Sequence, residues 1–250
     1  MLGPVERRLL GYDIQFETSV MAWPCDEPTD YVIDIDATVT HQPEEDADPV
    51  EVGSLSAHLI QLGRALDAGE PFEDVFDAHG EPLYDLYRKL FDRKKKWLRA
   101  AVQDSFEVIG LDILYLERIE IDAAHRGTGL GLVVISRCID VWEPQQGLVV
   151  CRPYPMQFDK LRKDDEAWKN RIGVDAFVKD KDEASQKLCS YWGRLGFKPV
   201  PNTDYWALST VSRRPSIADV LKPAAKMRQR MPAASSGTEA GPRSRSRKAR

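Results

Sequence analysis

Apolar and polar residues alternate with a period of two in several stretches of the chain, a pattern that predicts half-buried strands. The first stretch is "YVIDIDATVT" at residues 31–40. The second opens "VEVGSLSAHLIQLGRAL" at residue 50 and changes to a helical pattern near Gly63. Because only an acidic, proline-containing loop, "HQPEEDADP", separates them, we expect the two strands to pair antiparallel.

The spacing of apolar residues changes to a helical period between residues 71 and 103. The stretch "PLYDLYRKLFDRKKKWL" places five apolar residues on one helical face: Leu83, Leu86, Tyr87, Leu90 and Phe91. The basic cluster from Arg93 to Lys96 is then expected at the solvated end of this helical region, where positive charge suits the helix dipole.

Strands and helices alternate in the second half of the chain. Residues 111–121 predict a strand, residues 127–131 a glycine-rich turn, and "LGLVVISRCIDVW" a buried helix that ends before Pro144. The elements expected after it are a short strand at 147–155, a polar insertion at about 155–181, a helix over "DEASQKLCSYWGRLG" that ends at Gly196, and one or two strands up to residue 209.

The composition is that of a globular protein, with 42% hydrophobic and 30% charged residues among 250. No stretch approaches the roughly 18 consecutive apolar residues of a membrane-spanning helix, and the N-terminus has no secretory signal pattern. The four cysteines are scattered, without CxxC pairs or histidines at ligand spacing. We therefore expect reduced thiols, no metal, no membrane association and a cytoplasmic location.

Charge divides the chain into two parts. Residues 212–250 contain eleven Lys and Arg against two acidic residues, although the whole chain carries a net charge of −5. Their Pro, Ala, Ser, Gly and Arg content predicts a disordered basic tail after a folded domain at residues 1–211. The acidic domain is expected to attract cationic partners, whereas the tail offers weak, non-specific contact with nucleic acid.

The stretch "HRGTGLG" at residues 125–131 lies between a predicted strand and a predicted helix. A Walker loop is excluded because Leu132 and Val133 follow the last glycine, where Lys-Ser/Thr is required. The spacing differs from the GxGxxG of dinucleotide-binding folds, and no acidic residue follows the next strand. Two explanations stay open: a structural turn that needs left-handed dihedrals, and a loop whose backbone N–H groups bind an anion.

The pattern Arg126-x-x-Gly129-x-Gly131 resembles the acyl-CoA loop of the GNAT (Gcn5-related N-acetyltransferase) superfamily. About 55 residues later, "LCSYWGRLGF" resembles the family's second signature, a helix with a tyrosine before a Gly-Phe that opens a strand. The resemblance covers residues 110–209 and implies an α/β (α+β) fold. Its mixed, mostly antiparallel central sheet would be splayed at the acyl-CoA site and flanked by helices.

The resemblance also implies where acetyl-CoA, the acyl donor, would bind. Its diphosphate would contact the loop, and its pantetheine arm would contact backbone groups of the preceding strand. The residues implied are Ile119, Ile121, Arg126, Gly127, Thr128, Gly129, Leu130 and Gly131.

An attacking amine must lose a proton, and a carboxylate can accept it directly or through water. Glu117 and Glu120 are the candidates; even alternation would place them on opposite faces of the strand, so that at most one points at the substrate unless a bulge intervenes. We favour Glu117, which lies further from the loop. In the family a helical tyrosine protonates the departing thiolate, but its usual position here is Trp192. Tyr191 is the candidate acid, although a shift of one residue could turn it toward the core.

The sequence thus predicts an acetyl-CoA-dependent N-acetyltransferase that acts on a primary amine of a cationic small molecule or protein. The insertion at 155–181 is the expected specificity element, and Arg152 and Tyr154 are candidates for the acceptor side. A non-catalytic acyl-CoA-binding module with a basic interaction tail is the alternative.

Overall fold

The computed structural model describes residues 9–20, 27–144, 146–162 and 164–222. Its strands are β1 (Tyr12–Thr18), β2 (Val32–His41), β3 (Val50–Ile60), β4 (Phe91–Asp92), β5 (Trp97–Leu98), β6 (Ile113–Ile121), β7 (Leu148–Cys151), β8 (Lys198–Pro199) and β9 (Trp206–Ser209). Seven of them form one sheet in the order β1-β2-β3-β6-β7-β9-β8, and β4 pairs with β5. Only β6 and β7 are parallel neighbours, so the predicted mixed, mostly antiparallel sheet is confirmed.

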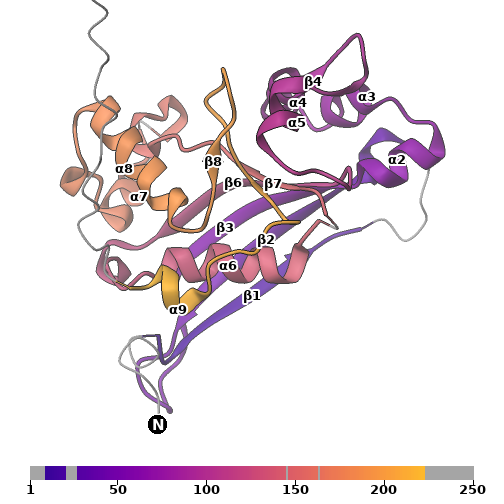
Figure 1. Cartoon of the computed structure of the whole chain (residues 1–250). Helices are drawn as coiled ribbons and strands as arrows, with labels where there is room; N and C mark the ends of the chain where they lie inside the picture. The colour runs from indigo at the N-terminus through magenta and orange to yellow at the C-terminus, as the bar shows by residue number, and fades with distance from the viewer. Residues whose placement is uncertain (1–8, 21–26, 145, 163, 223–250) are drawn as a thin grey trace, which may run out of the picture.

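Helices cover both faces of this sheet (Figure 1). They are α2 (Leu62–Ala68), α3 (Phe72–Asp77), α4 (Glu81–Leu90), α5 (Ala100–Ser105), α6 (Leu130–Trp142), α7 (Glu166–Ile172), α8 (Lys181–Gly193) and α9 (Ile217–Val220). In Figure 1, α6 and α9 lie in front of the sheet, whereas α2–α5 and α7–α8 form two separate groups above it. Within the described ranges, none of the helices has both the length and the apolar character needed to cross a membrane.

Two apolar clusters hold the layers together. One packs α2–α5 against the sheet, with Phe76, Leu86 and Leu90 fully buried. The other packs α6 against the opposite face, where Val134 and Ile139 are fully buried. Burial of such side chains contributes about 1.5–3 kcal/mol each. The sheet between the clusters is therefore a rigid base for the segments at its edge.

Most strand and helix predictions agree with the structure, and the antiparallel pairing of β2 with β3 is confirmed. The chain also forms β1, an edge strand that the sequence analysis did not predict. The continuous helical pattern expected at 71–103 is wrong, because α4 ends at Leu90 and a hairpin follows. Asp92 accepts hydrogen bonds from the backbone amides of Lys94 and Lys95, which turns the basic cluster into the tip of that hairpin.

The start of the predicted tail is ordered. Residues 212–222 include α9, whose Val220 is buried against α6. The guanidinium of Arg194 donates a hydrogen bond to the Val220 carbonyl. The disorder expected from residue 212 onward is therefore wrong for residues 212–222, because apolar Ile217, Val220 and Leu221 interrupt the polar composition. Residues 223–250, the rest of the predicted tail, lie outside the described residues.

Strands β6 and β7 separate before β6 ends. Their parallel pairing runs from Ile113–Leu148 to Leu116–Cys151, whereas β6 continues to Ile121 and stays paired with β3. Backbone groups along the last five residues of β6 therefore have no strand on that side. This divergence is the splay that the sequence analysis expected.

Candidate functional site

A cavity of about 940 Å³ opens where β6 and β7 separate. This volume is typical of small-molecule sites, which occupy roughly 300–1,000 Å³. Its walls come from Pro82 of α4, Tyr115 and residues 117–121 of β6, the glycine-rich loop, the chain after β7, the insertion, residues of α8 from Ala184 onward, and Arg194 at the end of that helix. Parts of the chain more than 100 residues apart thus meet around one space.

The structure brings nearly all predicted site residues to this cavity. Those that line it are Glu117, Ile119, Ile121, Arg126, Gly127, Gly129, Leu130, Gly131 and Tyr191. Thr128 does not line it: the hydroxyl of Thr128 donates to the His125 carbonyl and accepts from the Leu130 amide, which braces the loop. Arg152 and Tyr154, candidates for the acceptor side, also line the cavity.

The three glycines of the loop have two different structural roles. Gly127 and Gly129 have φ of +79° and +90°, the left-handed conformation that favours glycine. A Cβ at Gly131 would overlap the Tyr191 hydroxyl. Left-handed dihedrals thus explain two of the glycines, and the close approach of a tyrosine explains the third.

The loop presents a positive helix end to the cavity. Gly129 is the N-cap of the 13-residue helix α6. In the described part of the chain, the Gly129 and Gly131 amides donate no hydrogen bond. Such free N–H groups at a helix N-terminus favour an anion. Arg126 fixes the loop to β6, because its Nε donates to the Ile121 carbonyl at 2.8 Å and its guanidinium lies over the Phe177 ring.

A β-bulge places both candidate carboxylates on the same side of β6. In the register with β3, Ser56 faces Arg118 and Ala57 faces Leu116, so Glu117 has no partner. The extra residue reverses the alternation of faces. The bulge is thus the exception that the sequence analysis allowed: Glu117 and Glu120 are not separated by alternation, and both line the cavity.

Glu117 belongs to a chain of three ionisable groups. Its Oε2 lies 3.4 Å from Nε2 of His58, and His58 Nδ1 lies 2.7 Å from Asp34 Oδ1. The hydrogen bond to His58 holds the pKa of Glu117 below its usual value. Burial lowers the pKa of His58, but the two carboxylates together outweigh burial and raise it. Glu117 is therefore ionised at neutral pH. His58 lies beside it and can share a proton that this carboxylate accepts.

This network predicts a pH-dependent stability. Because its pKa is raised, protonated His58 stabilises the fold fully below about pH 6.5, and this stabilisation is lost as the pH rises through the folded-state pKa. Because its pKa is lowered, ionised Glu117 stabilises the fold above about pH 4.3, and this stabilisation is lost as the pH falls through its folded-state pKa. Replacing His58 by Asn should therefore cost about 1 kcal/mol more at pH 5.5 than at pH 9 in urea unfolding. The control is His79→Asn, whose ring contacts the Thr29 carbonyl. Equal losses from His58→Asn at both pH values would contradict the network.

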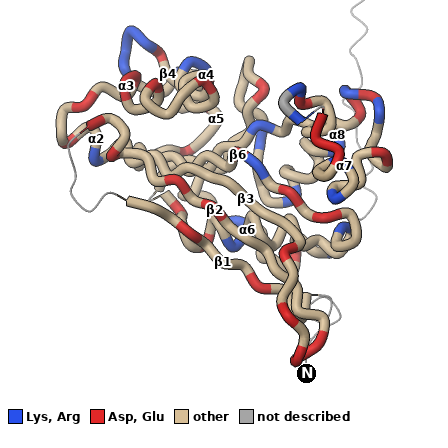
Figure 2. The backbone as a smooth tube through the Cα atoms, turned by 180° about the vertical axis from the view of Figure 1, so that it is seen from behind, with Lys and Arg blue, Asp and Glu red and all other residues tan. Residues whose placement is uncertain are grey.

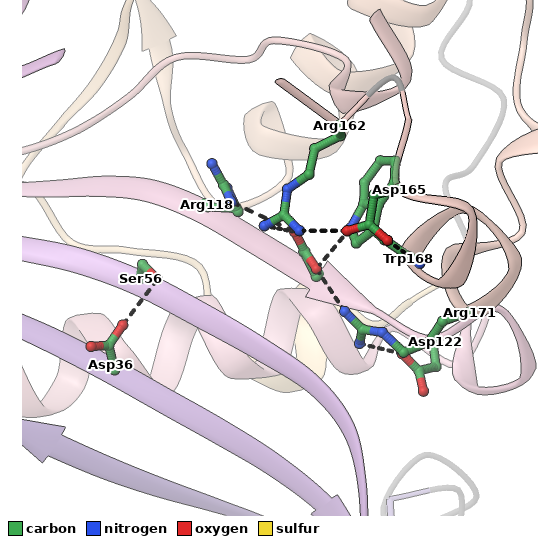
Figure 3. A network of polar contacts seen from close by, with 9 residues as sticks. Asp36, Ser56, Arg118, Asp122, Arg162, Asp165, Trp168 and Arg171 are labelled. Carbon is green, nitrogen blue, oxygen red and sulfur yellow. Dashed lines mark hydrogen bonds and ion pairs between the residues drawn. The ribbon is translucent and has the colours of Figure 1, made fainter. Parts of the chain in front are cut away.

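Glu120 anchors the insertion to β6. The residue is 5% exposed; Oε2 of its carboxylate accepts from Trp168 Nε1 at 3.1 Å and from Arg171 at 2.9 Å. Arg171 also bonds Asp122. Figure 3 shows Arg162, Trp168 and Arg171 approaching from the insertion. These partners give Glu120 a structural task, so Glu117 is the carboxylate available for chemistry.

Removing the main cationic partner of Glu120 should destabilise the protein. In Arg171→Ala a buried carboxylate loses its closest guanidinium, for which we expect a loss of about 2 kcal/mol in urea unfolding. Arg137→Ala, which breaks an exposed ion pair with Asp140, should change stability by about 0.5 kcal/mol or less. Similar losses in the two variants would mean that Glu120 does not depend on Arg171.

Tyr191 lines the cavity, and so does its neighbour Trp192, which is buried and packs against Phe197. The sequence left open whether Tyr191 turns inward, and the structure places its hydroxyl beside Gly131. Burial raises the pKa of Tyr191, so the hydroxyl is protonated at neutral pH and available as a donor.

Several cavity features could not be located from the sequence. His58 and Asp34 lie on strands whose pairing was unknown, and Tyr12 of the unpredicted β1 bonds His125, whose ring lines the cavity. In the described ranges, no group of three or more His, Cys, Asp or Glu residues is arranged to hold a metal ion.

Searches for similar proteins found no match to this chain among family models, curated proteins or solved structures.

Proposed function

We propose that the protein is an acetyl-CoA-dependent N-acetyltransferase of the GNAT type that acetylates a primary amine. The observation that carries the proposal is the divergence of β6 from β7 into a cavity that also holds the N-terminus of α6. One space thus offers free strand backbone for an extended arm and a positive helix end for a diphosphate.

The donor would lie along β6 with its diphosphate against the loop. Free amides of Gly129 and Gly131 would donate to phosphate oxygens, while Lys187 and Arg194 supply positive charge from α8. Each charge-assisted bond is worth about 1.5–3 kcal/mol. The residues present fit such a ligand, because the glycines add no side chains of their own beside these amides, although Leu221 packs against Gly129 and the Tyr191 hydroxyl against Gly131.

Glu117 would accept the proton of the acceptor ammonium. A lysine-like amine has a pKa near 10.4, so reaching its neutral form at pH 7.4 costs roughly 4 kcal/mol. Glu117 is ionised and lies at the bulge, level with the point where the strands part. Its low pKa makes it a weak base, but His58 and Asp34 can stabilise the proton that arrives.

The transfer forms an N–C bond and breaks the thioester C–S bond. One proton of the ammonium leaves through Glu117 before the amine attacks. The second leaves the nitrogen as the tetrahedral intermediate collapses and passes to solvent or to the sulfur, which departs as the thiolate of coenzyme A. The Tyr191 hydroxyl is protonated and lies beside Gly131, at the loop end of the cavity. We assign it the role of hydrogen-bond donor to the thiolate, for which its side chain would turn from Gly131 toward the sulfur; a thiol pKa near 8.5 allows departure even without it.

The test is the release of free thiol from acetyl-CoA in the presence of a panel of primary amines. Amine-dependent release is expected, together with calorimetric binding of coenzyme A. Tight binding without release for any amine would favour the alternative, a non-catalytic acyl-CoA-binding module. Absence of both would reject the two functions together.

A further inference from the structure

The charges inside the cavity differ from those of the whole molecule. Figure 2 shows acidic residues along β1 and β2, basic residues near β6, and both kinds around α7 and α8. Six basic residues line the cavity against three acidic ones: Arg118, Arg126, Arg152, Lys160, Lys187 and Arg194 against Glu117, Glu120 and Asp159. A cavity built only for a cationic acceptor would be lined by more acidic than basic residues.

The phosphates of the donor explain only part of this positive charge. Arg126 belongs to the loop, and Arg194 bonds the backbone of α9, which packs beside the loop. Arg118 lies three residues before the end of β6, about 10 Å of extended strand from Ile121. The pantetheine arm that would pass there carries no charge. Arg118 therefore has no task in holding the donor.

The bulge sets Arg118 beside the candidate base. Leu114 and Leu116 pack toward α6 before the bulge, and Ile119 and Ile121 do so after it. The intervening Glu117 and Arg118 therefore both point to the other side, where the cavity lies. A proton acceptor and a guanidinium stand next to each other at the point of acyl transfer.

Arg118 has unused hydrogen-bonding capacity. Its only ion pair in the described part of the chain is with Glu120 Oε1, at 4.0 Å, which is beyond hydrogen-bond reach. That oxygen has no hydrogen-bond partner. Arg152, by contrast, already pairs with Asp204. The guanidinium of Arg118 is thus the one best placed to bind a carboxylate through two parallel hydrogen bonds.

The insertion adds positive charge on the same side. Arg162 lies 3.8 Å from the Glu120 oxygen that Arg118 approaches. A smaller cavity of about 230 Å³ is lined by Lys160, Arg162 and Lys169, and it shares Gln157, Asp159 and Lys160 with the main cavity. An anionic group on the acceptor would therefore meet basic residues of the strand and of the insertion together.

We propose that the acceptor is a small amino acid, a primary amine that also carries a carboxylate. Its amine lies against Glu117, and its carboxylate binds Arg118 with support from Lys160. This inference rests on the proposed acetyltransferase function.

The test compares matched acceptors by thiol release from saturating acetyl-CoA. The pairs are phenylalanine with phenethylamine, lysine with cadaverine, and β-alanine with ethylamine. Loss of a charge-assisted carboxylate contact corresponds to about a 10- to 100-fold lower kcat/KM. We expect each amino acid to exceed its partner by that factor, and Arg118→Gln to remove the difference. Arg118→Lys keeps the positive charge but loses the planar guanidinium, so this variant should keep part of the preference for the amino acids.

The control is Arg137→Gln, at an exposed residue of α6 that does not line the cavity; this variant should keep the full preference. Calorimetry with coenzyme A verifies that Arg118→Gln is folded. Better turnover of the amines that lack a carboxylate, or an equal loss for both members of each pair in Arg118→Gln, would overturn the inference and leave the acetyltransferase standing. Absence of release with all six compounds would reject the proposed function itself.

Discussion

Replacing Glu117 by Gln is expected to lower kcat for amine acetylation by about 10²- to 10⁴-fold, the usual contribution of a positioned general base. The amide cannot accept the ammonium proton, and the hydrogen bond to His58 loses its charge. Binding of coenzyme A should not change, because the loop lies at the other end of the cavity. Steady-state thiol release and calorimetry measure the two effects separately.

The matched control for this variant is Glu51→Gln, at an exposed carboxylate of the neighbouring strand β3. It should keep full turnover. A rise in pH that restores Glu117→Gln toward the parent rate would support the assignment, since the amine then loses its proton to solvent. Parental kcat in Glu117→Gln at neutral pH would remove this residue from the mechanism.

Replacing Gly127 by Glu should weaken coenzyme A binding by about 100-fold or more. The new side chain adds a negative charge at the proposed phosphate site, where one adverse or lost charged contact would be worth about 1.5–3 kcal/mol. Gly127 lines the cavity, and a Cβ there meets no atom within 4 Å. The variant therefore tests charge rather than a clash.

Gly69→Glu is the matched control, because Gly69 has the same φ of +79°, also has open space around its Cβ, and lies outside the cavity. Both variants should lose about 1–2 kcal/mol of stability through left-handed strain. Only Gly127→Glu should lose affinity for coenzyme A. Similar affinities in the two variants would mean that the loop is a structural turn and nothing more.

The sequence predicts the elements that local patterns determine. Alternation located β2 and β3, and the buried helix α6 follows from its apolar run and from Pro144. The glycine loop and Tyr191 could be recognised because their spacing along the chain matches a family pattern. All but one of the predicted site residues line the same cavity.

Features that depend on pairing between distant segments could not be predicted. The bulge at Glu117 arises from the register of β6 with β3, which no local pattern reveals. His58 reaches Glu117 only because those strands are neighbours. The hairpin after α4 was missed because its apolar residues, Phe91 and Leu98, also fit a helical period. Tertiary contacts override local periodicity at these places.

Calorimetric titration with coenzyme A and, separately, with pantetheine tests the central claim most directly. If the loop at the N-terminus of α6 binds the diphosphate, coenzyme A should bind at least about 100-fold more tightly than pantetheine, which keeps the arm but lacks the phosphates and the adenosine. Equal affinities, or no heat with coenzyme A, would contradict the account.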